Sequence, residues 1–235
     1  MRTTDLLHLL QFGDSAFPVG AFSFSNGLES GVQHGAVHDL STLEQFVRTA
    51  IHQAATVDGI ALLVAHRSAG QSDLDAVVAA DRALIQRKLN EEMRIMTTRM
   101  GRKLAELAVH MLDAKDSGAN PTLLGQWLDQ IRSGVTPGTY PVGLALVFAA
   151  LRLDGRHAFA AHQYGVAAMM LGAALRLMRV SYLDTQAVLL EVNGTAEQAY
   201  QRIAGASLDQ MAGFAPLSDI LAASHRHAHV RMFMN

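Results

Sequence analysis

The sequence predicts an all-α fold, a single-domain bundle of about eight to ten helices. Apolar residues recur at intervals of three and four along most of the 235-residue chain, which is the period of an amphipathic helix. Outside one phenylalanine-rich stretch, no alternating strand pattern is longer than four residues. No repeat or low-complexity linker divides the chain. We therefore expect one domain over residues 1–235, with a flexible C-terminal tail from about residue 224 to 235.

An irregular segment near the N-terminus separates two apolar helical runs. It reads FPVGAFSFSNGLE and covers residues 17–29. Pro18, Gly20 and Gly27 interrupt helical periodicity there, and three phenylalanines lie among small polar residues. A substrate loop, a phosphate cradle and a packing corner are the three physical interpretations of this elbow.

Two long amphipathic patterns follow the elbow. The first opens at Ser41 and Glu44, which have the spacing of a capping box, and it continues to about His66. Residues 68–71 are expected to form a loop. The second pattern covers residues 73–111 with one slip of phase, so it corresponds to one kinked helix or to two helices.

The second half of the chain is also read as helical. Pro121 suits the first turn of a helix capped by Asn120 and ending near Arg132. A second irregular hinge, SGVTPGTYP, covers residues 133–141. The remaining helices are expected at residues 142–153, 158–179, 182–191, 195–206 and 217–227.

Composition excludes several functional classes. Half of the residues are hydrophobic and 17% are charged, against a typical charged share of about 25%. The net charge of −2 gives no electrostatic basis for binding nucleic acid or an anionic membrane surface. The chain has no cysteine, which excludes disulfides and thiolate catalysis. These properties favour a soluble, cytoplasmic protein.

Two uncharged stretches, residues 133–151 and 157–175, have the length of membrane spans. Pro137 and Pro141 interrupt the first, and His162 lies within the second. Because of these residues, both stretches are interpreted as buried core helices, and no membrane association is expected.

The catalytic motifs that suit such a chain are missing. The sequence contains no phosphate-binding G-x-x-x-x-G-K-[S/T], no H-E-x-x-H and no G-x-S-x-G. None of the seven glutamates is followed by histidine three residues later, as di-iron bundles require. We therefore expect no catalytic residues and no enzymatic activity.

Three histidines near the C-terminus form the one candidate metal site. If their segment is helical, His225 and His229 share a face at i,i+4 spacing, and His227 lies between them in the sequence. The other interpretation is a solvated terminal segment whose histidines have no specific role, and we favour it.

The N-terminal segment QFGDSAFPVGAFSFSNGLES at residues 11–30 resembles the signature of the urease accessory protein UreF family. That signature is roughly D-S-x-x-P-x-G-x-[F/Y]-x-x-S-x-G-L-E. The matching positions in this chain are Asp14, Ser15, Pro18, Gly20, Phe22, Ser25, Gly27, Leu28 and Glu29.

Further segments are similar to UreF motifs in the expected order. NEEMRIMTTRMGRKL at residues 90–104 resembles a family helix through Glu92, Arg94, Gly101 and Leu104. TYPVGLALVFAA resembles a hydrophobic helix of the family, and HRHAHVRMFMN resembles its C-terminal H-x(5)-R-L-F tail. The chain departs from the family at residues 176–182, where a usual Pro-Leu-Gly turn is missing.

The resemblance implies an all-α, dimeric protein without an active site of its own. It implies a scaffold that joins UreD (also called UreH) to the GTPase UreG, modulates that GTPase and serves nickel delivery to apo-urease. Nickel and GTP are then handled by the partners, and this chain binds no cofactor. The alternative is a direct nickel carrier that uses the C-terminal histidines. Under the family interpretation, the elbow is a packing corner that presents Glu29.

The resemblance also assigns roles to particular residues. The charged contacts to UreG are expected at Glu29, Asp58, Glu92, Arg176 and Arg231. Phe233 belongs to the tail, which in the family becomes ordered when a partner binds. Substitution of Glu29 or Arg231 by alanine is expected to impair UreG recruitment and to leave the fold intact, as surface substitutions do.

Overall fold

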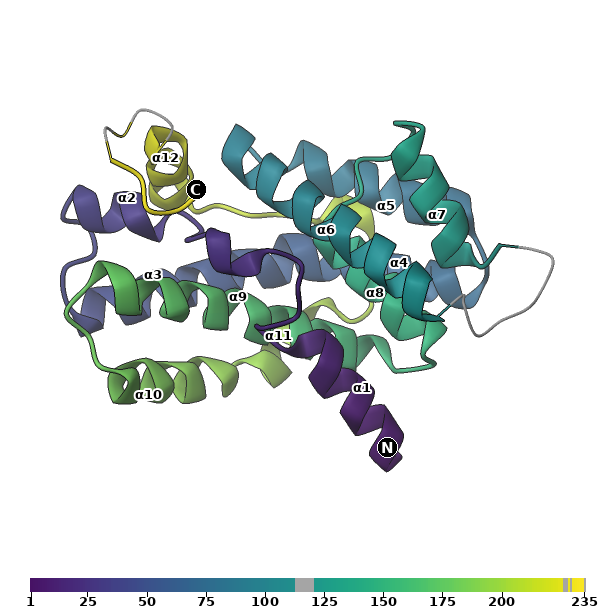
Figure 1. Cartoon of the computed structure of the whole chain (residues 1–235), viewed down its shortest axis with the longest axis horizontal. Helices are drawn as coiled ribbons and strands as arrows, with labels where there is room; N and C mark the ends of the chain where they lie inside the picture. The colour runs from purple at the N-terminus through teal and green to yellow at the C-terminus, as the bar shows by residue number, and fades with distance from the viewer. Residues whose placement is uncertain (113–120, 226–227, 229, 235) are drawn as a thin grey trace.

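The computed structural model describes residues 1–112, 121–225, 228 and 230–234, and all regular secondary structure in these residues is helical (Figure 1). The predicted all-α class is confirmed. The elements are α1 (Thr3–Gly13), η1 (Ala21–Ser23), α2 (Leu28–Gln33), α3 (Leu40–Ala54), η2 (Ala55–Gly59), α4 (Ile60–Gly70), α5 (Leu74–Gln86), α6 (Glu91–Leu112), α7 (Leu123–Arg132), α8 (Tyr140–Ala150), α9 (Gly155–Leu177), α10 (Tyr182–Asn193), α11 (Ala196–Ile203), η4 (Leu208–Gln210) and α12 (Pro216–Ser224).

The hydrophobic core consists of two clusters that α9 joins. The first cluster includes the buried faces of α4 to α8 and the N-terminal half of α9. The second includes α2, α3, α10, α12 and the C-terminal half of α9. Figure 1 shows the same division, with α2, α3, α10 and α12 at one end of the molecule and α5 to α8 at the other. Long α9 therefore fixes the two ends relative to each other.

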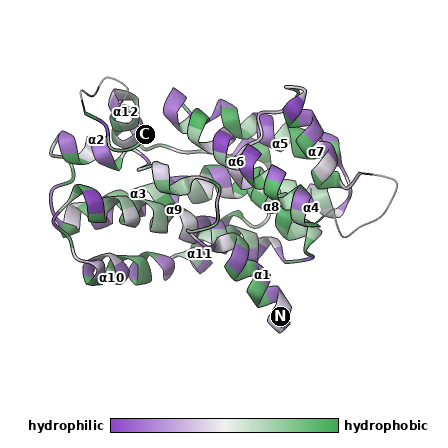
Figure 2. Ribbon diagram, in the orientation of Figure 1, coloured by the Kyte–Doolittle hydropathy of each residue, from purple (hydrophilic) through white to green (hydrophobic). Residues whose placement is uncertain are grey.

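The two uncharged stretches are core helices, as predicted. In α8 eight residues, Pro141 to Phe148, are buried, whereas α6 and α10 carry both hydrophilic and hydrophobic residues along their length (Figure 2). By length and composition, α9 is the single helix in the described residues that is able to cross a membrane. More than half of its most apolar window, 56%, is buried inside the domain.

The hinge at residues 133–141 is fixed by close packing and by one buried carboxylate. A Cβ atom added at Gly101 of α6 would lie 2.1 Å from the carbonyl oxygen of Gly138, so the helix and the hinge touch through their backbones. The carboxylate of Asp81 accepts hydrogen bonds from the hydroxyls of Thr136 and Thr139 and from the amides of Gly138 and Thr139. The hinge therefore starts α8 in a fixed direction.

The first long pattern starts earlier and ends later than predicted. The carboxylate of Asp39 accepts a hydrogen bond from the amide of Thr42 at 2.8 Å, so Asp39 caps α3 and the predicted capping box at Ser41 and Glu44 is wrong. The helix then continues through the π-helical η2 and through α4 to Gly70. The predicted loop thus begins only after that residue.

The second pattern is two helices rather than one kinked helix. Residues 87–90 separate α5 from α6. In α7, the hydroxyl of Thr122 accepts a hydrogen bond from the amide of Gly125 at 3.1 Å, so Thr122 is the N-cap. The predicted cap, Asn120, lies outside the described residues.

Candidate functional site

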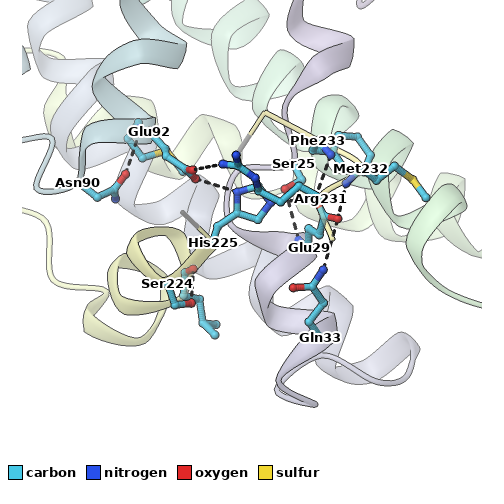
Figure 3. Close-up of polar contacts among 12 residues, drawn as sticks. Ser25, Glu29, Gln33, Asn90, Glu92, Ser224, His225, Arg231, Met232 and Phe233 are labelled. Carbon is cyan, nitrogen blue, oxygen red and sulfur yellow. Dashed lines mark hydrogen bonds and ion pairs between the residues drawn. The ribbon is translucent and has the colours of Figure 1, made fainter. Parts of the chain in front are cut away.

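Segments that are far apart in the sequence meet around the side chain of His225, at the C-terminal end of α12 (Figure 3). The imidazole is fully buried. Its Nε2 lies 2.9 Å from Oε2 of Glu29 on α2, and its Nδ1 lies 3.0 Å from Oε2 of Glu92 on α6. The guanidinium of Arg231 lies 3.5 Å from the other oxygen of Glu92. We call Glu29, Glu92, His225 and Arg231 the carboxylate clamp.

The carboxylate of Glu29 also holds the backbone of the C-terminal tail. The amide of Met232 donates to its Oε1 at 2.7 Å, and the amide of Phe233 donates to its Oε2 at 3.0 Å (Figure 3). One residue further, the amide of Met234 donates to the carbonyl oxygen of Ser23 at 2.8 Å. Residues 232–234 are therefore docked on the elbow and the start of α2.

The surroundings of Glu29 favour its ionised form. Burial by itself raises the pKa of a carboxyl group, but hydrogen bonds from Met232, His225 and Phe233 outweigh this effect and hold the pKa of Glu29 below its ordinary value. The pKa of a carboxylate that accepts several hydrogen bonds falls because those bonds are stronger with the charged form than with the neutral acid. Glu29 is therefore an anion that organises both the histidine and the tail.

Arg176 of α9 anchors the end of the tail through two aromatic rings. Its guanidinium carbon lies 4.0 Å from the ring centre of Phe22 and 4.1 Å from that of Phe233. It also donates a hydrogen bond to the carbonyl oxygen of Phe22 at 3.2 Å. Phe233 is buried in the second core cluster, whereas Phe22 is 73% exposed. The sandwich therefore has one buried side and one side that faces solvent.

The sequence of the elbow explains how α2 reaches the clamp. Gly27 has φ = 82°, a left-handed conformation that favours glycine, and a Cβ there would lie 3.4 Å from the Cβ of Ala222 on α12. The hydroxyl of Ser25 accepts a hydrogen bond from the amide of Glu29 at 3.3 Å. With Leu28 fully buried next to them, these residues form a packing corner.

The other signature residues divide between surface and support. Asp14, Ser15, Pro18 and Gly20 are exposed, and Asp14 accepts a hydrogen bond from the amide of Ala16 at 2.9 Å. On α6, Arg94 donates to the carbonyl oxygen of Lys88 at 2.7 Å, which braces the connection before the helix that carries Glu92.

Asp58 is not part of the clamp. It belongs to η2, is 5% exposed and pairs with Lys88 at 2.6 Å. Both residues line a pocket of about 500 Å³ that lies between the elbow, η2, α6, α9 and α12. His162 also lines this pocket, and burial lowers its pKa to about 4. Five methionines also line this pocket, namely Met93, Met96, Met100, Met169 and Met211.

The predicted interpretation of the C-terminal histidines is wrong for His225. Its ring is buried between two carboxylates and is not solvated, because α12 packs against α2 and α6. Both of its nitrogens are engaged, so this ring is not free to bind a metal ion. His227 and His229 lie outside the described residues. Among the residues that are described, no group of three or more His, Asp or Glu side chains is placed to hold a metal ion.

The structure brings most of the predicted contact residues together and changes the interpretation of Glu29. Glu92 and Arg231 belong to the clamp, and Arg176 and Phe233 hold the end of the docked tail. Glu29 is only 2% exposed, so the expectation that it lies on the surface is wrong. Its carboxylate faces inward because the imidazole and two tail amides surround it. The predicted flexible tail is, in residues 230–234, packed on the domain.

Sequence reasoning missed His225 as the centre of the clamp. A signal was present, because His225 and Arg231 have the spacing of the H-x(5)-R tail motif. The motif gave no sign that the histidine points inward while the arginine, at 46% exposure, reaches solvent.

Similarity to known proteins covers nearly the whole chain. The family model described as UreF matches residues 37–193. The chain is 59% identical over 230 residues to urease accessory protein UreF 2 of Brucella abortus (strain 2308), covering 98% of this chain and 92% of the relative. It is 48% identical over 235 residues to urease accessory protein UreF of Yersinia pestis (strain Pestoides F), covering all of both chains. The second alignment includes every residue of the clamp.

Proposed function

The chain belongs to the UreF family of urease accessory proteins, and we propose that it is a non-enzymatic scaffold in the assembly of the nickel centre of urease. In this role it joins UreD (UreH) to the GTPase UreG and modulates that GTPase while nickel is delivered to apo-urease. The partners bind the nickel and the GTP. The scaffold acts in the cytoplasm as a homodimer.

The carboxylate clamp is the observation that supports this proposal. Glu29, Glu92 and His225 of the clamp are buried, and Glu29 holds the tail, whereas Arg231 is accessible. Arg231 is 46% exposed and Met232 60%, and Phe22 of η1, whose ring stacks on Arg176, is 73% exposed. Arginine and aromatic side chains held rigidly at an edge are typical anchors of protein interfaces.

The proposal is tested by co-purification of this chain with UreD and UreG from the same source. We expect the wild-type chain to yield a three-protein complex, and we expect Arg231→Ala to lose UreG from it. Because Arg231 is half exposed and its ion pair is long, the substitution should lower the free energy of unfolding by less than about 1 kcal/mol. The measurement is the amount of UreG recovered per mole of this chain.

Arg179→Ala is the matched control. Arg179 follows α9, is exposed and lies outside the clamp, so its removal changes net charge equally. Full UreG recovery with the control and strong loss with Arg231→Ala supports the assignment. Equal recovery with both variants contradicts the role of the clamp in recruitment, and absence of any complex with soluble wild-type partners contradicts the scaffold itself.

A further inference from the structure

We propose that the pocket between α6 and α9 is a binding site for a soft monovalent metal ion, of which Cu⁺ is the biological example. The ligands are the thioether sulfurs of Met96 and Met100 together with the imidazole of His162, and all three side chains line the pocket. The site is separate from the carboxylate clamp, and it does not depend on the proposed function.

Methionines are concentrated on the walls of this pocket. Five of the eleven methionines of the chain line it. Met93, Met96 and Met100 are three and four residues apart, so they lie on one face of α6. Met169 lies on α9, and Met211 lies in the segment before α12. The pocket therefore has several sulfur donors within its own walls, and the chain has no cysteine that could supply a thiolate instead.

His162 lies next to the part of α6 that carries Met96 and Met100. Its ring centre is 6.3 Å from that of Tyr140, and the amide of Tyr140 donates a hydrogen bond to the hydroxyl of Thr97 at 3.2 Å. Thr97 lies between the two methionines in the sequence. The two sulfurs, at i and i+4 on one helix, and the imidazole from another helix therefore border the same part of the pocket.

This set of donors selects for a soft ion. Thioether sulfur is a soft ligand that favours Cu⁺, whereas imidazole suits several transition metals. A d¹⁰ ion also imposes no fixed coordination geometry, so two sulfurs and one nitrogen from packed helices can hold it. In the part of the chain that the structure describes, no three His, Asp or Glu side chains come together as metal ligands. Ni²⁺ and Zn²⁺ therefore lack the set of nitrogen and oxygen ligands that they need.

The charges around the pocket favour a monovalent ion as well. The described lining contains three acidic and three basic side chains, namely Asp14, Asp58, Asp219, Arg87, Lys88 and Arg176. Because these charges balance, the walls do not compensate an entering cation. The cost of transferring an ion out of water rises with the square of its charge, so a divalent ion is penalised much more than a monovalent one.

The imidazole of His162 can bind a metal without first losing a proton. Its Nδ1 is buried and has no hydrogen-bond partner among the described residues. Burial lowers the pKa of His162 to about 4, so at neutral pH the ring is neutral and one nitrogen has a free lone pair. Thioethers do not titrate. The affinity for Cu⁺ should therefore stay constant between about pH 6 and about pH 8, whereas protons compete at an ordinary solvated histidine.

The test is an anaerobic titration of the full chain with Cu⁺, kept reduced by ascorbate, against the competing chelator bicinchoninate. The chain carries His227→Ala and His229→Ala, so that these C-terminal histidines do not contribute. We expect a single ion to bind with the same affinity from about pH 6 to about pH 8, and an excess of Ni²⁺ should not displace it. X-ray absorption should show sulfur in the first coordination shell of the copper.

A double variant, Met96→Leu with Met100→Leu, removes both sulfurs and keeps the side-chain volume similar, so the fold should persist. Its affinity for Cu⁺ should fall by at least about tenfold, because loss of a group that merely supports a ligand already costs that much. Met111→Leu is the matched control. Met111 lies on α6 and packs against the first core cluster but does not line the pocket, so this variant should bind as the parent chain does.

His162→Gln should also weaken binding by at least about tenfold, because it removes the imidazole. Circular dichroism checks that each variant is helical, and if the double variant does not fold, His162→Gln and Met111→Leu decide in its place. The proposal is overturned if the double variant binds Cu⁺ as tightly as the Met111→Leu control, which would leave the methionines as core filling. Absence of Cu⁺ binding, a copper shell without sulfur, or displacement by Ni²⁺ overturns it equally.

Discussion

Glu29 has a structural task that its motif does not reveal. It is 2% exposed, and its carboxylate accepts four hydrogen bonds, from His225, Met232, Phe233 and, at 3.5 Å, Gln33. A charged residue in an N-terminal signature suggests a surface contact, but Glu29 is buried and binds the backbone amides of the docked tail. Glu29 therefore positions the tail that carries Arg231.

We expect Glu29→Ala to lower the free energy of unfolding by about 2–4 kcal/mol, because it leaves a buried histidine and two amides without their acceptor. Urea denaturation followed by circular dichroism measures the change. Glu106→Ala, at an exposed position of α6, is the control and should stay within about 0.5 kcal/mol of wild type. A Glu29→Ala chain as stable as this control would contradict the buried role.

At the scale of elements, α6 and the hinge before α8 cross with their backbones in close contact, so there is no room for an added side chain at the crossing. The backbone of Gly101 lies so close to Gly138 and Thr139 that an added Cβ would come within 2.1–2.5 Å of their atoms. Backbone atoms at that distance cannot be moved aside as a flexible side chain can. Asp81 of α5 also accepts hydrogen bonds from the amide and hydroxyl of Thr139, so the residue that precedes α8 cannot move away from α6 without disturbing them.

We expect Gly101→Ala to lower the thermal midpoint strongly, with a loss of more than about 2 kcal/mol in unfolding free energy, because the helices must separate. Gly165→Ala is the matched control, since Gly165 lies inside α9 and has open space around its Cα. Gly165→Ala should leave the unfolding free energy unchanged or raise it by up to about 1 kcal/mol, because alanine has a higher helix propensity than glycine. Equal midpoints for the two variants would show that the crossing relaxes without cost.

On the scale of the whole molecule, two core clusters share one long helix, and a pocket opens where they meet. That pocket contains His162 of α9, whose imidazole is buried beside the Asp58–Lys88 pair. Burial dominates there and lowers the pKa of His162 to about 4, although the negative charge of Asp58 opposes this effect. The neutral ring is therefore part of the folded state at ordinary pH.

The stability of the whole domain should consequently fall on the acid side. The pKa of His162 is lower in the folded state than its ordinary value of 6.5, so its contribution is complete above about pH 6.5 and is lost as pH falls toward 4. Between about pH 6.5 and 5 this amounts to about 2 kcal/mol.

Comparison of wild type with His162→Gln isolates that contribution, because all other titrating groups are common to both chains. We expect the unfolding free energy of the wild type minus that of His162→Gln to be lower by about 2 kcal/mol at pH 5 than at pH 7, because only the wild type loses the contribution of His162. If this difference does not change with pH, burial does not lower the pKa of His162 and the prediction is wrong.

The sequence by itself determined the all-α class, most helices, the elbow as an interruption, and the family. These are local properties, because amphipathic periods, Gly and Pro breaks and contiguous motifs can all be read over a few turns. The N-cap of α3 was still mispredicted, because the sequence alone does not show that Asp39, rather than Ser41, accepts a hydrogen bond from an amide in the first turn of the helix.

Only the tertiary structure decided which residues form the clamp and which of them face inward. Glu29 and His225 are separated by 196 positions, and they meet because α12 packs against both α2 and α6. A sequence shows the charge of each residue but not the partner that compensates it. The buried histidine, its two carboxylates and the docked tail depend on that packing, since in an unpacked chain each of these groups is satisfied by water.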